Sequence, residues 1–290
     1  MMKASFDPEI DAASALLTAA PVALSRQGLL SALWTLFRME VSRQCRARRM
    51  LVVLVLFALP VAFAVLAHVY NTDSLQTDEV EVNLVFYFIP HALVPLTALL
   101  YASGMIQDEI EEQTLTYLLV RPLPKWAIYV TKLLATFLVT SLLVGCFTIA
   151  TDTAIFWGSE NLWSEILPAR ALKTAALIAL SLMAYVSLFG CVSLFVKRTL
   201  AVGVAYIILF EGVIANIDFV ARWMTVMFYF RVLSERWLDL RERDWSINLD
   251  TAPAAATCVW VLAGASLVAT VLAALIFTVR EFRVKTPEGS

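Results

Sequence analysis

Six apolar segments, each long enough to cross a lipid bilayer as a helix, are the feature that most constrains this chain. They cover residues 50–70, 84–106, 127–150, 171–196, 200–217 and 254–279. A span needs about 20 apolar residues, and a backbone in lipid must satisfy its own hydrogen bonds, as a helix does. The composition agrees, because 60% of the residues are hydrophobic and 16% are charged. We therefore predict an all-α integral membrane protein whose residues 50–279 form six transmembrane helices.

The distribution of arginine and lysine predicts the orientation of the chain. Six arginines precede the first span: Arg26, Arg38, Arg43, Arg46, Arg48 and Arg49. The connection over residues 71–83 contains four acids and neither lysine nor arginine. Because basic residues flank spans on the cytoplasmic side, we expect both termini in the cytoplasm and the protein in a bacterial inner or plasma membrane. The five arginines within residues 218–250 oppose this orientation, although acids in the same long loop offset them.

Residues 27–49 show helical periodicity ahead of the first span. The apolar side of this periodicity consists of Leu30, Leu33, Trp34, Phe37 and Val41. Such a helix lies in the membrane interface, with its apolar face at the headgroup boundary and its arginines near anionic lipid. We predict an amphipathic interfacial elbow helix here, with a plain juxtamembrane anchor as the alternative. Residues 1–26 lack the positive start of a cleaved signal peptide and are expected to form a cytoplasmic tail.

A second apolar stripe lies in the loop over residues 218–250, between the fifth and sixth spans. It consists of Phe219, Trp223, Val226, Met227, Phe230 and Leu233. The stripe is too short and too rich in arginine for an ordinary span. We therefore predict an outer re-entrant or surface helix pair before the sixth span. Residues 280–290 are expected to form a second cytoplasmic tail.

The sequence contains little material for a catalytic or cofactor site. His68 and His91 are its two histidines, and its four cysteines have no metal-type spacing. It also lacks the glycine-rich loop G-x-x-x-x-G-K-[ST] that cradles phosphates. The net charge of −2 argues against a nucleic-acid partner. We predict no catalytic residue, no metal and no cofactor in this chain, and we expect His91, beside Pro90, to cap backbone carbonyls at a kink.

The stretch QDEIEEQTLTYLLVRPLPKW, residues 107–126, follows the second span directly. Its acidic part consists of Asp108, Glu109, Glu111 and Glu112. These carboxylates repel one another unless water or cationic partners surround them, so they should face the cytosol. They also suit the start of a helix that runs to Leu119 and ends before Pro122. We predict a short amphipathic docking helix, with a solvated connecting loop as the alternative.

The order of residues in this stretch resembles the signature of ABC exporter permeases of the second type. In that signature an acidic pair, a Thr-Leu, a Leu-Leu and an Arg-Pro follow the second span, and a lysine lies in the next helix. The corresponding residues here are Asp108, Glu109, Glu111, Glu112, Thr114, Leu115, Leu118, Leu119, Arg121, Pro122 and Lys132. Gln113 departs from the pattern, because family members commonly have glycine at that place. The elbow helix, the six spans and the outer helical element also match the layout of the family.

The resemblance implies a permease subunit that would couple ATP hydrolysis by a separate nucleotide-binding subunit to movement of a substrate across the membrane. ATP and Mg would bind to that cytoplasmic ATPase, and the coupling segment over residues 107–125 would dock on it. The implied ATPase-coupling residues are Asp108, Glu109, Glu111, Glu112, Thr114, Leu115, Leu118, Arg121 and Pro122. A second permease copy, identical or different, would complete the transporter in the lipid bilayer.

Polar residues within the spans are the remaining candidates. Glu211, in the fifth span, costs about 3 kcal/mol or more to place in lipid unless it is paired, protonated or wet. We predict that Glu211 and Asn216 line a translocation path, with a structural pairing of Glu211 to Asn216 or Arg222 as the alternative. Lys132, in the third span, is expected to snorkel to the cytosolic headgroups.

Two other functions are compatible with a six-span protein. An ion-coupled secondary transporter predicts inverted repeats and broken helices near the midplane of the membrane. A membrane anchor subunit of an enzyme complex predicts several histidines or another ligand cluster within the spans. The sequence shows neither pattern, which favours the exporter over both alternatives. The transported substrate cannot be read from the sequence.

Overall fold

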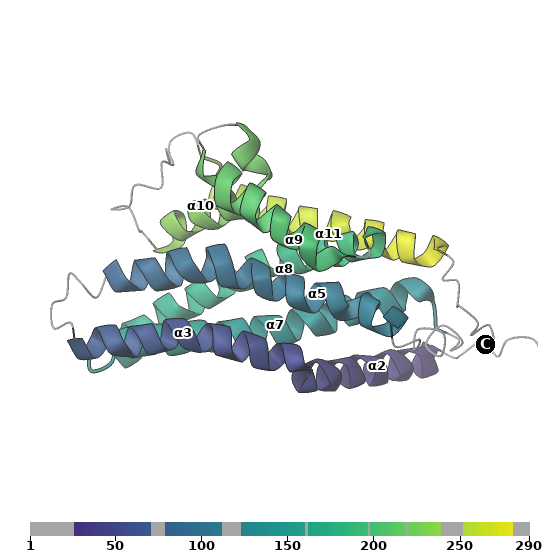
Figure 1. Ribbon diagram of the computed structural model, residues 1–290, viewed down its shortest axis with the longest axis horizontal. Helices are drawn as coiled ribbons and strands as arrows, with labels where there is room; N and C mark the ends of the chain where they lie inside the picture. The colour runs from purple at the N-terminus through teal and green to yellow at the C-terminus, as the bar shows by residue number, and fades with distance from the viewer. Residues whose placement is uncertain are drawn as a thin grey trace, which may run out of the picture.

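A computed structural model shows a bundle of long helices (Figure 1). It describes residues 26–70, 79–111, 123–159, 162–196, 198–217, 220–238 and 252–280. The α-helices are α2 (Arg26–Arg46), α3 (Arg48–Tyr70), α5 (Val94–Glu111), α7 (Lys125–Ile155), α8 (Leu172–Phe195), α9 (Thr199–Tyr206), α10 (Val226–Leu238) and α11 (Ala255–Val279). Wider π-helical turns form η1 (Val82–Leu93), η2 (Leu162–Ala171) and η3 (Ile207–Val213), and 3-10 turns form η4 (Ile214–Asn216) and η5 (Val220–Met224).

Six helices of the described chain are long and apolar enough to cross a membrane, which confirms the predicted number of spans. They cover Arg48–Tyr70, Glu79–Glu109, Lys125–Ile155, Pro168–Phe195, Thr199–Asn216 and Ala255–Val279. η1 continues into α5, η2 into α8, and α9 into η3 and η4, so each of these spans is one helix with a change of pitch. The chain is therefore a multi-pass all-α membrane protein.

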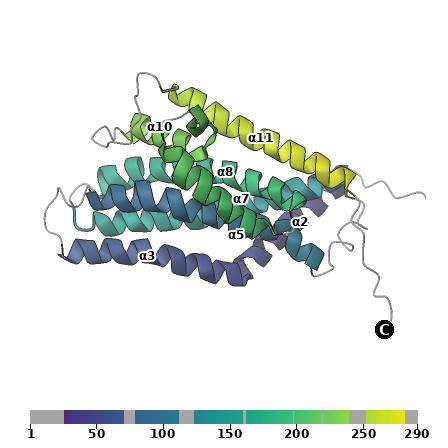
Figure 2. The same ribbon diagram turned by 45° about the horizontal axis from the view of Figure 1, so that its top comes forward.

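The spans run side by side along the long axis of the molecule (Figures 1 and 2). α2 lies at one end of the bundle, where α11 also ends, and α10 lies at the opposite end. We call these the α2 end and the α10 end. The chain enters α3 and leaves α5 at the α2 end, so the acidic stretch begins there.

The spans form an inner and an outer group. In the most apolar window of the second span 61% of residues are buried within the chain, against 22% in the first, fifth and sixth spans. α8 contacts α5, α7, α10 and α11, whereas α3 packs chiefly on α7. The core between the inner helices contains large buried side chains such as Tyr129, Tyr185 and Phe189. The outer spans consequently expose apolar faces to lipid or to another protein.

Two of the pitch changes coincide with proline, Pro90 in η1 and Pro168 in η2. Proline has no N–H to donate and its ring clashes with the preceding turn, so a wider turn accommodates it. Beside Pro90, His91 Nδ1 lies 2.8 Å from the Tyr87 carbonyl oxygen, and its ring stacks on that of Tyr87. His91 therefore contacts a backbone carbonyl beside Pro90 as expected, while the kink itself stays a prediction.

α2 is a continuous helix over nearly the whole of the predicted elbow segment, and it ends at Arg46 rather than at residue 49. Leu36 packs in a small apolar cluster with Leu123 and Ile128 at the start of α7, while Leu30 and Trp34 remain exposed. One side of α2 therefore rests on the bundle and another is free to meet lipid. The interfacial position of α2 stays a prediction.

α10 lies within the stretch predicted to form an outer helix pair, and η5 precedes it. Most of its side chains, from Met227 to Glu235, are buried, and it packs on α8 and α11. α10 is therefore part of the helical core at its end of the bundle. Its re-entrant or surface position relative to a bilayer stays a prediction, and residues 239–250 of the predicted pair lie outside the described residues.

Candidate functional site

The last turns of α5 contact several other elements at the α2 end. Gln107, Asp108 and Glu109 follow one another in the chain, and successive residues of an α-helix point about 100° apart. Each of the three side chains consequently reaches a different neighbour. We call these residues and their partners the α5 junction.

Gln107 binds the turn between the fourth and fifth spans. Its Nε2 donates to the carbonyl oxygen of Val196 and to Oγ1 of Thr199, each at 2.8 Å. Thr199 is buried and also donates to the Val196 carbonyl at 2.8 Å. The end of α5 is thereby fastened to the point where α8 ends and α9 begins.

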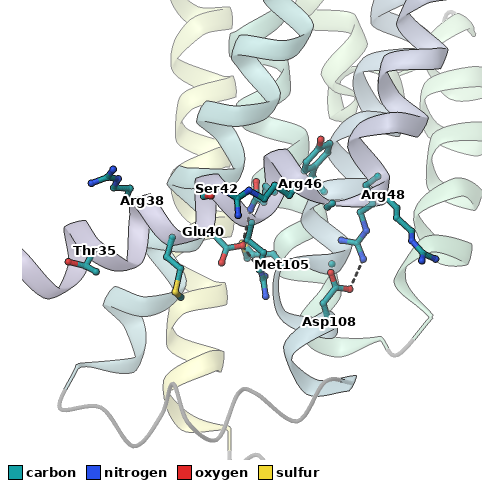
Figure 3. Close-up of a pocket in the computed structure, with 15 residues that line it drawn as sticks. Thr35, Arg38, Glu40, Ser42, Arg46, Arg48, Met105 and Asp108 are labelled. Carbon is teal, nitrogen blue, oxygen red and sulfur yellow. Dashed lines mark hydrogen bonds and ion pairs between the residues drawn. The ribbon is translucent and has the colours of Figure 1, made fainter.

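Asp108 binds the start of α3. Its Oδ1 lies 2.5 Å from Nη2 of Arg49, an ion pair in which both side chains are about one-third exposed. The guanidinium of Arg49 lies over Gly104, where a Cβ would overlap it. Glycine at this position therefore leaves room for Arg49 to reach Asp108, where a dashed line in Figure 3 marks the ion pair.

Glu109 joins a cluster of four charges, of which Glu40, Glu109 and Lys132 are buried and Arg43 is partly exposed. Lys132 Nζ lies 2.6 Å from Glu109 Oε1 and 2.7 Å from Glu40 Oε2. Arg43 completes the cluster, at 3.0 Å from Glu40 Oε1 and 3.5 Å from Glu109 Oε1. The two positive and two negative charges balance, so α2, α5 and α7 are held together without net buried charge.

The expectation that Lys132 snorkels to the headgroups was wrong. Its side chain is 0% exposed and points into the protein. Lys132 lies about 10 Å along α7 from the helix start, and two carboxylates from neighbouring helices meet it there. These carboxylates offset the loss of hydration that would otherwise drive the ammonium to the membrane surface.

At Glu40, the effect of burial on the pKa is opposed by the neighbouring positive charges. Burial alone would raise its pKa, but the charges of Lys132 and Arg43, with hydrogen bonds from Lys132 and Gln44, hold the pKa of Glu40 below its ordinary value. Burial opposes the charge of Arg43 too, and the carboxylates of Glu40 and Glu109 nevertheless raise the pKa of Arg43. The shifts of both pKa values favour the charged forms of Glu40 and Arg43 at neutral pH.

Gln44 extends the cluster along α2 and α7. Its Nε2 donates to Glu40 Oε1 at 3.0 Å and to Thr136 Oγ1 at 2.8 Å. Thr136 lies one turn after Lys132 on α7. Together with Glu40, this gives α2 two polar attachments to α7 beside the apolar contact of Leu36.

A second polar group lies at the α10 end and contains both predicted translocation-path residues. Glu211 is buried, and its carboxylate accepts from the backbone N–H groups of Val226 and Met227, at 3.3 and 3.2 Å. Tyr206 donates its hydroxyl to the same carboxylate at 3.3 Å. Because Val226 begins α10, Glu211 satisfies N–H groups that have no acceptor within that helix.

Asn216 takes part in the same region through Arg231 of α10. Nη2 of Arg231 donates to Asn216 Oδ1 at 2.6 Å and to Nε2 of His91, and its Nη1 donates to the carbonyl oxygen of Ala215 at 3.3 Å. Arg231 is buried. The second and fifth spans are therefore joined through α10, by a residue that the sequence reasoning had treated only as a charge in a loop.

The described part of the acidic stretch is short. Asp108 and Glu109 have described side chains, and Glu111 is the last residue of α5. The other predicted ATPase-coupling residues, Glu112, Thr114, Leu115, Leu118, Arg121 and Pro122, lie outside the described residues. Among the described residues no group of three or more His, Cys, Asp or Glu side chains could hold a metal ion.

Comparison with known families decides between the functions that the sequence left open. The family described as ABC-2 family transporter protein matches residues 36–212. The chain belongs to this family. The match includes every member of the charge cluster and also Glu211. Among curated proteins, no significant match was found.

An ABC-2 family transporter protein with six spans is the membrane-embedded permease subunit of an ABC transporter. The family membership confirms the resemblance seen in the acidic stretch, and it excludes the secondary transporter and the enzyme anchor as descriptions of this chain. Subunits of this kind are generally not themselves catalytic.

The roles of several residues of the α5 junction were not predicted from the sequence. Glu40 was the clearest available signal, because it is the one carboxylate among the arginines that precede the first span. Lys132 was a second signal, because a charge within an apolar span usually has a partner. Gln107 carried no signal of its own, since an amide at the end of a span is unremarkable until its partners are known.

Proposed function

We propose that this ABC-2 permease subunit couples a separate cytoplasmic ATPase to substrate export through the α5 junction. One observation carries the proposal. Three consecutive residues at the end of α5 bind the α8–α9 turn, the start of α3, and the α2–α7 pair. A displacement of the segment that follows α5 would therefore move several spans together.

These contacts divide the acidic stretch into an anchoring part and a docking part. Asp108 and Glu109 already have cationic partners within the chain, so they anchor the segment to the bundle. Glu111, Glu112 and the residues up to Pro122 are then the part that docks on the ATPase. On ATP binding, closure of the ATPase pair would displace this docking part, and the junction would pass the movement on as a rigid-body rearrangement.

The remaining features of the proposal concern orientation and partners. The α2 end, with its arginines, faces the cytoplasm of the cell, and the α10 end faces outward. ATP and Mg bind to the partner ATPase. A second permease copy, identical or different, packs on an exposed apolar face of the outer spans, which are the least buried within one chain.

The decisive experiment reverses the charge of the proposed docking part. The tagged chain is purified gently from its native membrane, and stoichiometric partners are identified by mass spectrometry. We expect a phosphate-loop ATPase with the unchanged chain and much less of it with Glu111→Lys/Glu112→Lys, because the acids would no longer complement a cationic receptor surface. The matched control is Glu79→Lys, a reversal at an exposed residue of the α10 end.

The outcomes test two statements separately: docking through Glu111 and Glu112, and coupling to a separate ATPase. Loss of the ATPase from the double variant but not from Glu79→Lys supports docking through this segment. Equal recovery of the ATPase from all three proteins would contradict docking through Glu111 and Glu112. Recovery of no ATPase from the unchanged chain would contradict coupling to a separate subunit.

A further inference from the structure

A large arginine-lined cavity lies beside the charge cluster at the α2 end and shares Glu40 and Arg43 with it. It has a volume of about 960 Å³ and is bounded by α2, the start of α3 and the last turns of α5 (Figure 3). Five arginines and two carboxylates line it, so its lining carries an excess of three positive charges. A cavity of this size and charge suits an anionic ligand larger than a single inorganic ion.

The excess charge comes from three arginines. Arg43 and Arg49 are paired with carboxylates of the α5 junction. Within the described part of the chain, Arg38, Arg46 and Arg48 form no hydrogen bond or ion pair, and all three are exposed. Guanidinium groups bind phosphate oxygens through two parallel N–H donors, a geometry that lysine does not offer.

Two buried polar atoms in the cavity wall also have no partner. Tyr101 is 3% exposed and its hydroxyl binds no protein group, and Gln44 is 7% exposed and its Oε1 accepts no hydrogen bond. Both residues line the cavity. A buried polar atom left unpaired costs about 1–3 kcal/mol, so such atoms in native proteins usually have a partner of some kind. Here they offer one donor, which suits a phosphate oxygen, and one acceptor, which suits a hydroxyl.

The position of the cavity relative to the spans indicates the source of such a ligand. The first span begins at Arg48 and the second ends at Glu109, so two spans end beside the cavity. Lipid phosphates lie at this level of a membrane. The positive end of the α3 dipole is also here, and Leu51 and Val55 on the first turns of α3 are exposed as lipid-facing residues would be.

We propose that the arginine-lined cavity binds a phosphate ester, with Arg46 and Arg48 contacting the phosphate and Tyr101 donating to it. A hydroxyl of the same ligand donates to Gln44 Oε1. An anionic glycerophospholipid supplies both groups, and its acyl chains run along the exposed face of α3. A bound headgroup would offset part of the arginine excess and fix α2 against α3 and α5.

The test measures binding to the purified, delipidated full chain by native mass spectrometry. The probes are phosphatidylglycerol, zwitterionic phosphatidylcholine of the same chain length, and soluble glycerol phosphate. We expect phosphatidylglycerol to bind in preference to phosphatidylcholine. In Arg46→Gln/Arg48→Gln that affinity should fall about 10- to 30-fold, while Lys173→Gln/Arg236→Gln, which removes two exposed cations elsewhere, should retain it.

A second variant separates binding from folding. Tyr101→Phe removes a buried hydroxyl that has no protein partner, so it should not lower the thermal stability of the delipidated chain and should still weaken phosphatidylglycerol binding several-fold. Equal binding of glycerol phosphate and phosphatidylglycerol would support the phosphate site with a soluble source. Unchanged binding in both cavity variants would overturn the proposal. So would a loss of the partner ATPase from Arg46→Gln/Arg48→Gln with lipid binding intact, because the cavity would then be a protein-docking surface.

Discussion

Lys132 is fully enclosed by protein within the third span, and two carboxylates share its charge. Removing the cation by Lys132→Met would leave Glu40 and Glu109 buried with Arg43 as their remaining cationic partner. Because an incompletely paired buried charge is costly, we expect the free energy of unfolding to fall by about 3–5 kcal/mol. The measurement is thermal unfolding in nanodiscs.

The same substitution at an exposed site provides the control for Lys132. Lys173→Met, on the surface of α8, should change the unfolding midpoint little. If Lys132→Met were as stable as Lys173→Met, the cluster would contribute nothing to the packing of α2 and α5 on α7. That result would also remove the physical basis for passing a movement of the acidic stretch to α2 and α7 through Glu109.

Glu40 gives the charge cluster a defined pH dependence. Its folded-state pKa is below the ordinary carboxyl value, chiefly because Lys132 and Arg43 oppose the effect of burial. A lowered folded-state pKa contributes stability that is complete above the unfolded-state pKa of about 4.3 and is lost as the pH falls toward the lower folded value. We expect the unfolding midpoint of the unchanged protein to decrease below about pH 4.5.

The comparison that tests this pH dependence is Glu40→Gln. The variant should be less stable at neutral pH, and its midpoint should decrease less than that of the unchanged protein over the same acid range. If the unfolding midpoints of the two proteins decreased equally with falling pH, the acid sensitivity would come from other carboxylates. The measurement requires a detergent or lipid without an ionisable headgroup.

At the scale of helices, one buried guanidinium joins α10 to two of the spans. Arg231 donates to the Ala215 carbonyl and to Asn216 of the fifth span, and to His91 of the second. Hydrogen bonds from a charged donor contribute about 1.5–3 kcal/mol each. We expect Arg231→Met to increase hydrogen exchange over residues 226–238 by about 30-fold, which corresponds to about 2 kcal/mol.

Arg236→Met is the matched control for Arg231, because it removes an exposed arginine of the same helix. Exchange over residues 226–238 should change little in this variant, and exchange in α7 should be unaffected in both. If the two arginine variants exchanged alike, the apolar contacts of α10 with α8 and α11 would be sufficient to hold it.

The elements that the sequence predicted well are those with a local signal. A run of about 20 apolar residues is sufficient to indicate a span, and all six were found. The order of residues in the acidic stretch indicated the family correctly. Its carboxylates were expected to begin a helix, whereas Asp108, Glu109 and Glu111 lie in the last turns of α5. The fourth-span π-helical turn at Pro168 and the burial of α10 have weaker local signals, since they depend on how neighbouring helices pack.

The contacts of the α5 junction join residues far apart in the sequence, and for that reason they could not be predicted. Glu40 and Lys132 are 92 residues apart in the sequence and 2.7 Å apart in space. Neither periodicity nor spacing relates two such positions, and a lysine near the end of a span is ordinarily expected to reach the headgroups. Glu211 and Asn216 were identified as notable residues, but their partners in α10 follow only from the fold.

At the scale of the whole molecule, the bundle has two ends of different chemistry. The α2 end contains the arginines of α2 and the charge cluster, and the α10 end contains the turn after α7 and the Glu211 group. Positive residues near span ends remain in the cytoplasm, so the two ends should lie on opposite sides of the membrane. Native Cys45 on α2 and Ser159 after α7 are both exposed and report on the two ends separately.

The orientation is tested with a membrane-impermeant maleimide and two single-cysteine proteins. One keeps Cys45 and has the other three cysteines replaced by alanine, and the second carries Ser159→Cys in a chain with all four replaced. We expect Ser159→Cys to react in intact cells and Cys45 to react only in inverted vesicles. The reverse pattern would place the acidic stretch outside, away from any cytoplasmic ATP, and would end the coupling proposal. Reaction of both proteins from one side would contradict the odd number of spans that separates them, because α3, the second span and α7 lie between Cys45 and Ser159.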